Sequence, residues 1–329
     1  MSASAAPAPP LALPAAPRRM GHATFWLLAA LAGLVVAAGL RTLGSEYGYF
    51  AATFVLQYVI LATAWNILGG YAGYVNFGAA AFFAAGTYTT VVAGKALGVG
   101  LIPSIGLAAL VGGVIGFGTA LLTLRLRGAY FAIATLCLAV VLQTVIVNTP
   151  YVGGSRGAYV IRPREVPPPF DTYAGFLCLL VLALAVIAVA IARTIERSRL
   201  GLGLAALRDD EAAAEAAGVP TLRLKLIATS ISGAMMAVAG APLPFLNGYV
   251  EPNGAFGLSY AVNAIAMPII GGTASWAGPV IGAVLLASLQ QAATVTISSA
   301  ANLLIVGVVL VVFVCAAPHG IIGLFRKRR

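Results

Sequence analysis

The residue types that most often carry chemistry are few in this sequence and lie far apart. Cys137, Cys178 and Cys315 each stand inside an apolar run, without the CxxC spacing of metal and redox sites. We expect these cysteines to act as small hydrophobic residues. His22 and His319 are too isolated to hold a metal. Because the apolar runs contain no clustered acids, no paired histidines and no nucleophile beside a base, the sequence disfavours a membrane enzyme.

Motifs that hold nucleotide phosphates are also missing. The pattern GxxxxGK(S/T) has no match: Gly94 and Lys95 form the only Gly-Lys pair, and Thr89 stands where the first glycine should be. No GxGxxG motif opens a helix after a strand. If ATP drives this protein, we expect a separate chain to hydrolyse it, and we expect this chain to bind no cofactor itself.

The composition indicates which elements position the remaining residues. The 329 residues are 61% hydrophobic and 9% charged, with a mean hydropathy of +1.00. A soluble domain has about 25% charged residues, so the composition excludes that class. The apolar runs are continuous, as in residues 179–191, and do not alternate as they would in a β-barrel. The sequence therefore predicts an all-α polytopic membrane protein, a bundle of about eight to ten transmembrane helices.

The apolar runs divide the chain into three parts. Residues 1–24 are rich in Ala and Pro and are predicted to form a disordered cytoplasmic tail. A transmembrane domain covers residues 25–318, and residues 319–329 form a basic cytoplasmic tail. The run 25–40 is expected to be the first span, with a signal peptide as the alternative. The expected spans are 25–40, 48–68, 77–94, 99–124, 129–149, 172–192, 226–247, 258–271, 277–296 and 302–318.

The basic residues predict the orientation, because Lys and Arg are enriched in cytoplasmic segments. With a cytoplasmic N-terminus and ten spans, 14 of the 19 basic residues fall on the inside and 5 on the outside. Both termini are therefore expected to be cytoplasmic. Since the charges lie between apolar runs, the net charge of +10 reflects this orientation, and we expect no binding to nucleic acid.

One long hydrophilic interruption, residues 193–225, lies on the predicted cytoplasmic side. Within it, the segment from Asp209 to Pro220 is predicted to form a short surface helix. Acids stand at its N-terminus, alanines fill its middle, and Gly218 followed by Pro220 ends it. The segment is too short and too polar to cross a bilayer, so we expect it to contact another protein. A solvated connector is the simpler alternative.

Uncharged polar residues are more frequent than charges within the expected spans. None of the 28 Lys, Arg, Asp and Glu residues lies in the middle of a span, which argues against a proton-driven transporter. Sodium coupling through carbonyl and hydroxyl oxygens stays open. Each polar residue alone could bond across helices, and together they could line a neutral path. They are Asn66, Asn76, Gln143, Asn148, Asn263, Gln290 and Asn302.

Two glycine-rich breaks interrupt the apolar runs, at residues 68–78 and 268–279. Each contains a Gly-Gly pair followed by an aromatic residue and a further glycine, so a weak internal repeat is one interpretation. Interrupted segments at related positions indicate a transport path. Two tight turns packed by glycine are the alternative. The predicted path residues are Asn66, Gly69, Gly70, Gly73, Asn76, Gln143, Asn263, Gly271 and Gly272.

Six motifs in order give the sequence a resemblance to a known family, and together they extend over nearly everything after residue 45. The sequence resembles the permease subunits of bacterial ABC importers for branched-chain amino acids, of the LivM type. The motifs are WNILGGYAG at 65–73 continuing to AAFF at 80–83, LRLRGAYFA at 124–132, GGSRG at 153–157, SRLGLG at 198–203 with RDDEAA at 208–213, IGG at 270–272 with GP at 278–279, and PHG at 318–320.

The resemblance implies a multi-pass protein of the bacterial inner membrane that works with partners. These are two cytoplasmic ATPase subunits, a homologous second permease subunit and an extracytoplasmic substrate-binding protein. The family's ATPase-docking loop maps onto residues 208–218 of this sequence. The implied coupling residues are Arg208, Asp209, Asp210, Glu211, Glu215 and Gly218.

Two departures from the family pattern bear on docking and substrate. Gly218 follows Glu211 by seven residues rather than six, and residues 74–80 lack the polar or His-containing stretch of many relatives. The implied substrates are leucine, isoleucine and valine, with urea or short amides as related alternatives. A self-sufficient secondary transporter or channel for a small neutral or zwitterionic solute is the competing function.

Overall fold

A computed structural model describes residues 45–123, 126, 128–162, 170, 172–296, 301–316 and 320–326, together with Trp26 and Gly33. The expected tail 1–24 lies outside these residues, as does the expected span 25–40 apart from Trp26 and Gly33. Part of the expected C-terminal tail is a short helix, α15 (Gly320–Arg326).

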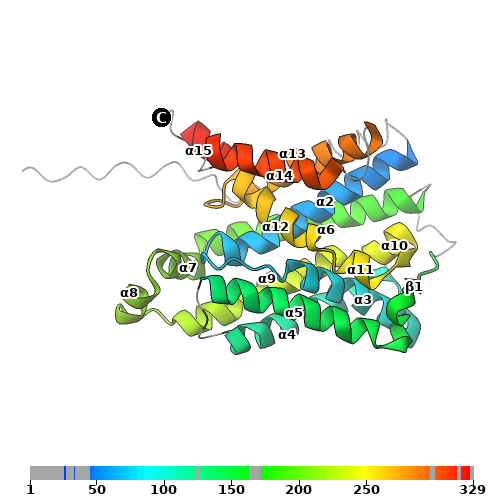
Figure 1. The fold of residues 1–329 in the computed structure, drawn as a ribbon, viewed down its shortest axis with the longest axis horizontal. Helices are drawn as coiled ribbons and strands as arrows, with labels where there is room; N and C mark the ends of the chain where they lie inside the picture. The colour runs from blue at the N-terminus through cyan, green and yellow to red at the C-terminus, as the bar shows by residue number, and fades with distance from the viewer. Residues whose placement is uncertain are drawn as a thin grey trace, which may run out of the picture.

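Long helices that lie side by side make up nearly all of the described chain (Figure 1). Among the described residues, seven helical segments are long and apolar enough to cross a membrane: α2 (Glu46–Gly69), α4 (Leu101–Thr123), α5 (Ala129–Val147), α6 (Tyr173–Arg197), α9 with α10 (Thr221–Asn247), α11 with α12 (Pro252–Gly271) and α13 (Ala277–Val295). Two further helices fall on expected spans: α3 (Ala79–Leu97) and α14 (Ala301–Ala316). The prediction of an all-α polytopic membrane protein is confirmed.

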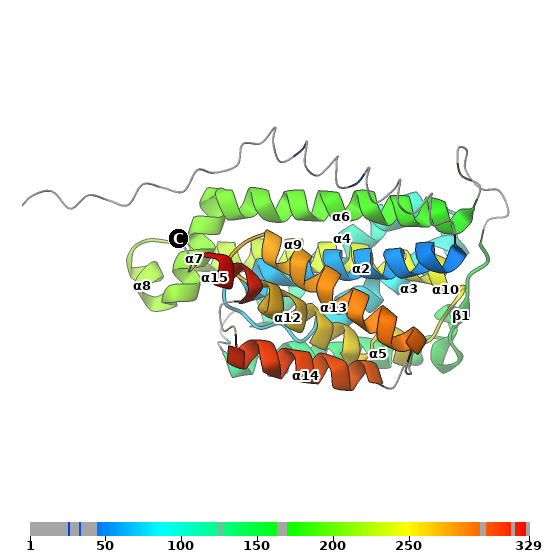
Figure 2. The ribbon, with the colours of Figure 1, turned by 90° about the horizontal axis from the view of Figure 1, so that it is seen from above.

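The centre of the bundle is formed by α2. Within an 18-residue apolar stretch of α2, 72% of the residues are buried, against 11% for the corresponding stretch of α5, which therefore lies at the periphery. Figure 2 shows α6 and α14 on opposite sides of the bundle with α2 between them. Glycines bring α4 and α9 (Thr221–Gly240) together: a Cβ added at Gly116 would lie 2.6 Å from the carbonyl oxygen of Thr229. Such close approach favours helix association where water provides no driving force.

The two flanking helices extend into the predicted hydrophilic interruption, residues 193–225. Helix α6 ends at Arg197 and α9 begins at Thr221. Between them, α7 (Arg199–Asp209) and α8 (Glu211–Ala216) form a helical projection at one end of the bundle (Figure 1). We refer to this end as the α8 end.

The surface helix predicted from Asp209 exists, but its start is two residues later. Asp209 is the last residue of α7, and Asp210 is the N-cap of α8. The Asp210 carboxylate accepts hydrogen bonds from the backbone N–H groups of Ala212 and Ala213, at 2.8 and 3.0 Å. This cap provides acceptors for two N–H groups at the helix start, which explains why the chain turns here. Gly218, with φ +82°, follows the helix end as predicted.

The opposite end of the bundle carries short irregular elements. The two-residue strands β1 (Ala158–Tyr159) and β2 (Tyr249–Val250) pair antiparallel there. The 3-10 turns η1 (Pro150–Val152) and η2 (Gly154–Arg156) connect α5 to β1, and the short helices α10 (Leu243–Asn247) and α11 (Pro252–Ala255) flank β2. Helix α12 (Leu258–Gly271) then leads back to the α8 end, from which α13 (Ala277–Thr296) departs.

Candidate coupling and pathway site

The first glycine-rich break is an ordered loop between α2 and α3. The indole N–H of Trp65 donates to the carbonyl oxygen of Asn76 at 2.8 Å, which fastens the loop to α2. The Asn76 side-chain oxygen accepts from the N–H of Gly78 at 2.7 Å, directly before α3 begins. Asn76 is buried in this turn, so its amide stabilises the start of a helix. Gly73 takes φ +77°, a conformation that favours glycine.

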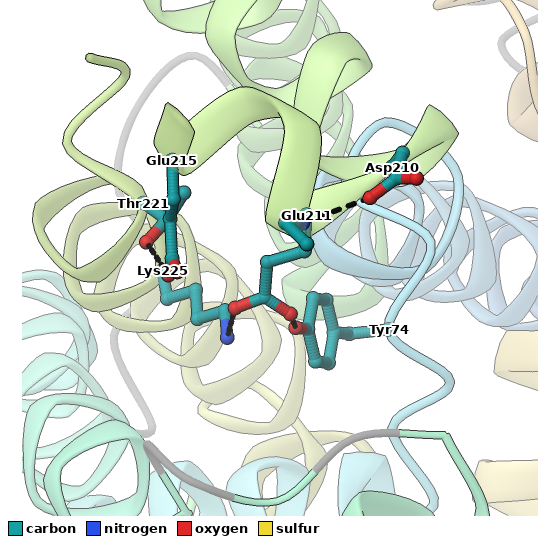
Figure 3. Close-up of polar contacts among 7 residues, drawn as sticks. Tyr74, Asp210, Glu211, Glu215, Thr221 and Lys225 are labelled. Carbon is teal, nitrogen blue, oxygen red and sulfur yellow. Dashed lines mark hydrogen bonds and ion pairs between the residues drawn. The ribbon is translucent and has the colours of Figure 1, made fainter. Parts of the chain in front are cut away.

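This loop lies directly against the α7–α8 projection. The Arg208 guanidinium donates to the carbonyl oxygen of Gly70 at 3.3 Å. A Cβ added at Gly73 would lie 2.8 Å from Cγ of Arg208, so the glycine also makes room for that side chain. The Tyr74 hydroxyl donates to Oε2 of Glu211 at 2.6 Å (Figure 3). The predicted coupling residues Arg208 and Glu211 therefore contact the loop that contains the predicted pathway residues Gly70 and Gly73.

Glu211 is the centre of this contact. Its Oε1 forms an ion pair with the ammonium group of Lys225 on α9, and the same ammonium lies 4.8 Å from the centre of the Tyr74 ring. The side chains of Glu211 and Lys225 are only 11% and 9% exposed, so the pair is largely removed from water. In such surroundings a carboxylate needs several partners, and here its two oxygens bond to different elements.

The other predicted coupling acids differ from Glu211 in being exposed. Asp209 lies 3.6 Å from Arg208, with 74% of its side chain exposed. Glu215 accepts a hydrogen bond from the hydroxyl of Thr221 at 2.7 Å, across the turn that joins α8 to α9. Asp210 and Gly218 are exposed as well. The exposed surface of the projection therefore includes three acids, alongside Arg199 and the apolar Leu202 of α7.

The second glycine-rich break, between α12 and α13, lies beside the first. The Asn66 amide donates to the carbonyl oxygen of Thr273 at 3.2 Å. Glu196, near the end of α6, joins both breaks: its Oε2 accepts from the N–H of Trp276 at 2.7 Å and from the Tyr71 hydroxyl at 3.4 Å. Burial, reinforced by the Glu196 carboxylate, raises the pKa of Tyr71, so its hydroxyl stays protonated and remains a donor.

Backbone packing holds the second break together. A Cβ added at Gly271 would overlap the carbonyl oxygen of Gly278, and one added at Gly278 would overlap that of Gly272. Gly282 stands equally close to the carbonyl oxygen of Met267, and Gly320 of α15 packs on Gly272. These glycines let the ends of α12, α13 and α15 meet backbone to backbone.

Two predicted pathway residues lie away from this end. Asn263, in the middle of α12, donates to the Tyr58 hydroxyl at 3.1 Å and accepts from the amide of Gln290 at 2.9 Å. Gln143 donates to the Asn253 side chain at 3.0 Å, on the part of α5 that faces the opposite end of the bundle. In this chain the predicted pathway residues thus form three separate groups, and most make hydrogen bonds between helices or within turns.

Comparison with known proteins identifies the family. Residues 47–314 match the family model described as the permease component of the branched-chain amino acid transport system. The chain belongs to this permease family. No solved structure matches it significantly.

Individual relatives of this permease carry the same description. The high-affinity branched-chain amino acid transport system permease protein LivM of Salmonella typhimurium is 27% identical over 327 residues, which cover 91% of this chain and 75% of the relative. LivM of Escherichia coli is 26% identical over 84% of this chain and 70% of its own length. A LivH branched-chain amino acid transport permease of Methanocaldococcus jannaschii is 23% identical over 77% of this chain and 84% of its own length. These relatives are named as transport components rather than as enzymes.

Several residues of the permease site were missed in the sequence. Tyr71, Tyr74 and Trp276 stand within the glycine-rich breaks, and Glu196 and Lys225 stand within the predicted interruption. Two signals in the sequence could have indicated these residues: aromatic residues close to the Gly-Gly pairs, and charged residues at the ends of apolar runs. Within the described part of the permease, no group of three His, Cys, Asp or Glu residues is placed to hold a metal ion.

Proposed function

We propose that this permease is the membrane subunit of an ABC importer for leucine, isoleucine and valine, driven by separate ATPase subunits. The family match and the names of the relatives support the transport class. The observation that carries the proposal is the α7–α8 projection. Its acids Asp209, Asp210 and Glu215 are exposed, while Glu211 and Arg208 on the same projection bond to a loop between two membrane spans.

In this proposal the α8 end is cytoplasmic and docks the ATPase subunits. A six-residue helix cannot cross a bilayer, and its exposed acids suit a partner surface with basic residues. Asp209, Asp210, Glu215 and Gly218 belong to the docking surface, together with the flank of Arg208. Both termini are then cytoplasmic, in agreement with the excess of Lys and Arg on that side.

The complete importer would contain two ATPase subunits, a homologous second permease subunit and an extracytoplasmic substrate-binding protein, in the inner membrane of a bacterium. The two permeases together would form the path. Asn66, Asn263 and Gln143 provide amide groups along this chain, and the glycines of the two breaks provide backbone dipoles. A zwitterionic amino acid would meet these dipoles in place of fixed charges, which suits passage better than tight binding. The affinity would then lie in the external binding protein.

The proposal is tested by reconstitution. The permease is expressed together with its partner subunits, purified and placed in liposomes that contain ATP on the ATPase side. We expect ATP-dependent accumulation of radiolabelled leucine, inhibited by excess valine but not by urea or acetamide. Inhibition by urea alone would assign the related substrate class instead. Accumulation of leucine by this chain without any ATPase would contradict the proposal and favour a self-sufficient transporter.

Docking is tested by cross-linking. Single cysteines are placed at Asp209, Glu215 and Gly218 in a background in which the three native cysteines are replaced by serine. We expect disulfide or maleimide cross-links to the ATPase subunit at one or more of these positions. A cysteine at Tyr47, exposed at the opposite end of α2, serves as the control that should form none. Capture of the ATPase without any cross-link in the segment would refute the docking assignment.

A further inference from the structure

We infer that Tyr74 is the positioning residue through which a movement of α8 reaches the first glycine-rich break. The inference rests on the proposed function, since it assumes that a partner displaces α8. It assigns a role in transport coupling to a loop tyrosine that lies 137 residues before its partner Glu211.

The first step is the attachment of α8 to the loop. The Tyr74 hydroxyl and the Glu211 carboxylate are 2.6 Å apart, a short charge-assisted hydrogen bond. Figure 3 shows the Glu211 side chain directed from α8 into the bundle, between Tyr74 and Lys225. Because the carboxylate is only 11% exposed, water cannot easily replace the tyrosine if the bond breaks. A displacement of α8 must therefore move Tyr74 or leave a buried charge with fewer partners.

The second step is that the loop is held by the projection at two points. Arg208 bonds to the carbonyl oxygen of Gly70, and Glu211 bonds to Tyr74. The two points flank Gly73, whose positive φ makes the turn between them. The Arg208 side chain also packs against Gly73 itself. A segment held on both sides of its turn moves together with the element that holds it.

The third step leads from the loop to the spans. The Tyr74 ring packs edge-to-face on Phe131 of α5, with 5.2 Å between ring centres. Phe131 is buried, although α5 is the least buried of the seven candidate spans. The Phe77 N–H bonds to the Thr135 hydroxyl one turn further along α5, at 3.1 Å. The loop is therefore in contact with α5 as well as with α2 and α3.

Lys225 attaches the Glu211 carboxylate of α8 to helix α9. It lies in the first turns of α9, the helix that packs through glycines against α4. One Glu211 oxygen bonds to this helix and the other bonds to the loop. The carboxylate thus joins a packed helix to the loop, and a shift of α8 changes the geometry between them.

The experiment uses the complete reconstituted importer and measures ATP hydrolysis and leucine uptake in the same vesicles. Tyr74→Phe removes one hydroxyl and keeps the ring on Phe131. We expect leucine imported per ATP hydrolysed to fall about tenfold, the effect of losing a hydrogen bond to a buried charge. The amount of ATPase that co-purifies should be unchanged. Tyr130→Phe, at an exposed tyrosine on α5, is the matched control and should keep the ratio.

Glu211→Gln gives the second variant, with Glu46→Gln at the opposite end of α2 as its control. If both residues act through one bond, the double variant Tyr74→Phe/Glu211→Gln should be no worse than Glu211→Gln alone, within about twofold. If the double variant lowers the ratio of leucine imported to ATP hydrolysed by the product of the two single effects, the residues act separately and the inference is refuted.

The remaining outcomes distinguish this inference from the proposed function. A normal ratio in Tyr74→Phe refutes the inference and leaves the proposed function intact. An equal loss of ATP hydrolysis, uptake and thermal stability would show that Tyr74 only holds the fold, which also refutes it. If the wild-type complex shows no ATP-dependent uptake, the proposed function fails, and the inference fails with it.

Discussion

The two glycine-rich breaks have similar sequences but are held by different forces. Side-chain contacts from Arg208 and Glu211 hold the first break to the α7–α8 projection. Direct contact between backbones, at Gly271 with Gly278 and at Gly282 with Met267, holds the second. A shared pattern of glycines therefore does not imply a shared mechanical role.

The difference follows from what each type of contact tolerates. Hydrogen bonds and ion pairs between flexible side chains can re-form after a shift, because the side chains adjust. Backbones packed without side chains between them have little freedom, since close-packed interiors deform poorly. We therefore expect the second break to tolerate displacement less well than the part of the first break that Arg208 and Glu211 hold.

The largest expected effect tests the packing of the second break. Gly278→Ala places a methyl group onto the carbonyl oxygen of Gly272, and we expect a loss of about 3 kcal/mol or more in the free energy of unfolding. The measurement is the thermal unfolding midpoint and yield of the purified permease in detergent. Gly118→Ala is the control, because its added Cβ meets nothing within 4 Å. Similar midpoints for the two variants would show that the second break is not close-packed.

The next effect concerns Glu196, whose carboxylate bonds to both breaks. Glu196→Ala leaves the Trp276 N–H and the Tyr71 hydroxyl without their acceptor, which should cost about 1–3 kcal/mol of stability. Glu196→Gln keeps an acceptor oxygen and should cost less than half as much. Denaturation of both variants by heat in detergent provides the comparison. An equal loss in the two variants would mean that the charge, and not the hydrogen bonds, stabilises this contact.

A pair of glycine variants separates backbone strain from contact with Arg208. Gly73 and Gly98 both have positive φ, and alanine at either should cost about 1–2 kcal/mol. Only at Gly73 does the new Cβ meet a side chain, that of Arg208. We therefore expect similar losses of stability but a fall in leucine uptake for Gly73→Ala alone. Equal uptake by the two variants would contradict a role for the first break in transport.

The smallest expected effect is the loss of the bond between Asn66, near the end of α2, and the second break. Asn66→Ala removes the hydrogen bond to the Thr273 carbonyl oxygen, which should cost about 0.6 kcal/mol, the usual value for such bonds within membrane proteins. Asn148→Ala is the control, because its exposed amide bonds only to Thr144 of the same helix. A large loss of stability for Asn66→Ala would show that α2 and the second break depend on each other more than this contact indicates.

The helices could be predicted from the sequence because their signals are local. Continuous apolar runs gave the spans, and acids, alanines and Gly218 predicted the surface helix α8. The exact ends of these helices could not be predicted, because charged residues at the end of an apolar run are compatible with either a helix or a loop. In the structure α6 and α9 continue through these charges, and the Lys225 charge is neutralised by Glu211 from α8.

The site could be predicted only in its parts. Residues 208–218 and the glycine-rich breaks were found separately, but nothing local indicates that Tyr74 and Glu211 meet, because 137 residues separate them. Because Asn76, Asn263 and Gln143 are polar residues in or beside apolar runs, the sequence also predicts that they line one path. The structure assigns Asn76 to a turn, Asn263 to a buried hydrogen-bond network and Gln143 to the far end of α5. Which side chains share a surface depends on tertiary packing, which a pattern of residue types does not contain.

The burial of the Glu211–Lys225 pair has a practical consequence for handling the protein. Dissolved ions screen exposed charges strongly and buried pairs much less. Raising the ionic strength should therefore weaken attraction at the outer acids, Asp209 and Glu215, while leaving the inner pair intact. A concentrated salt wash would then release the proposed ATPase subunits, while the ion pair between Glu211 and Lys225 inside the permease stays intact.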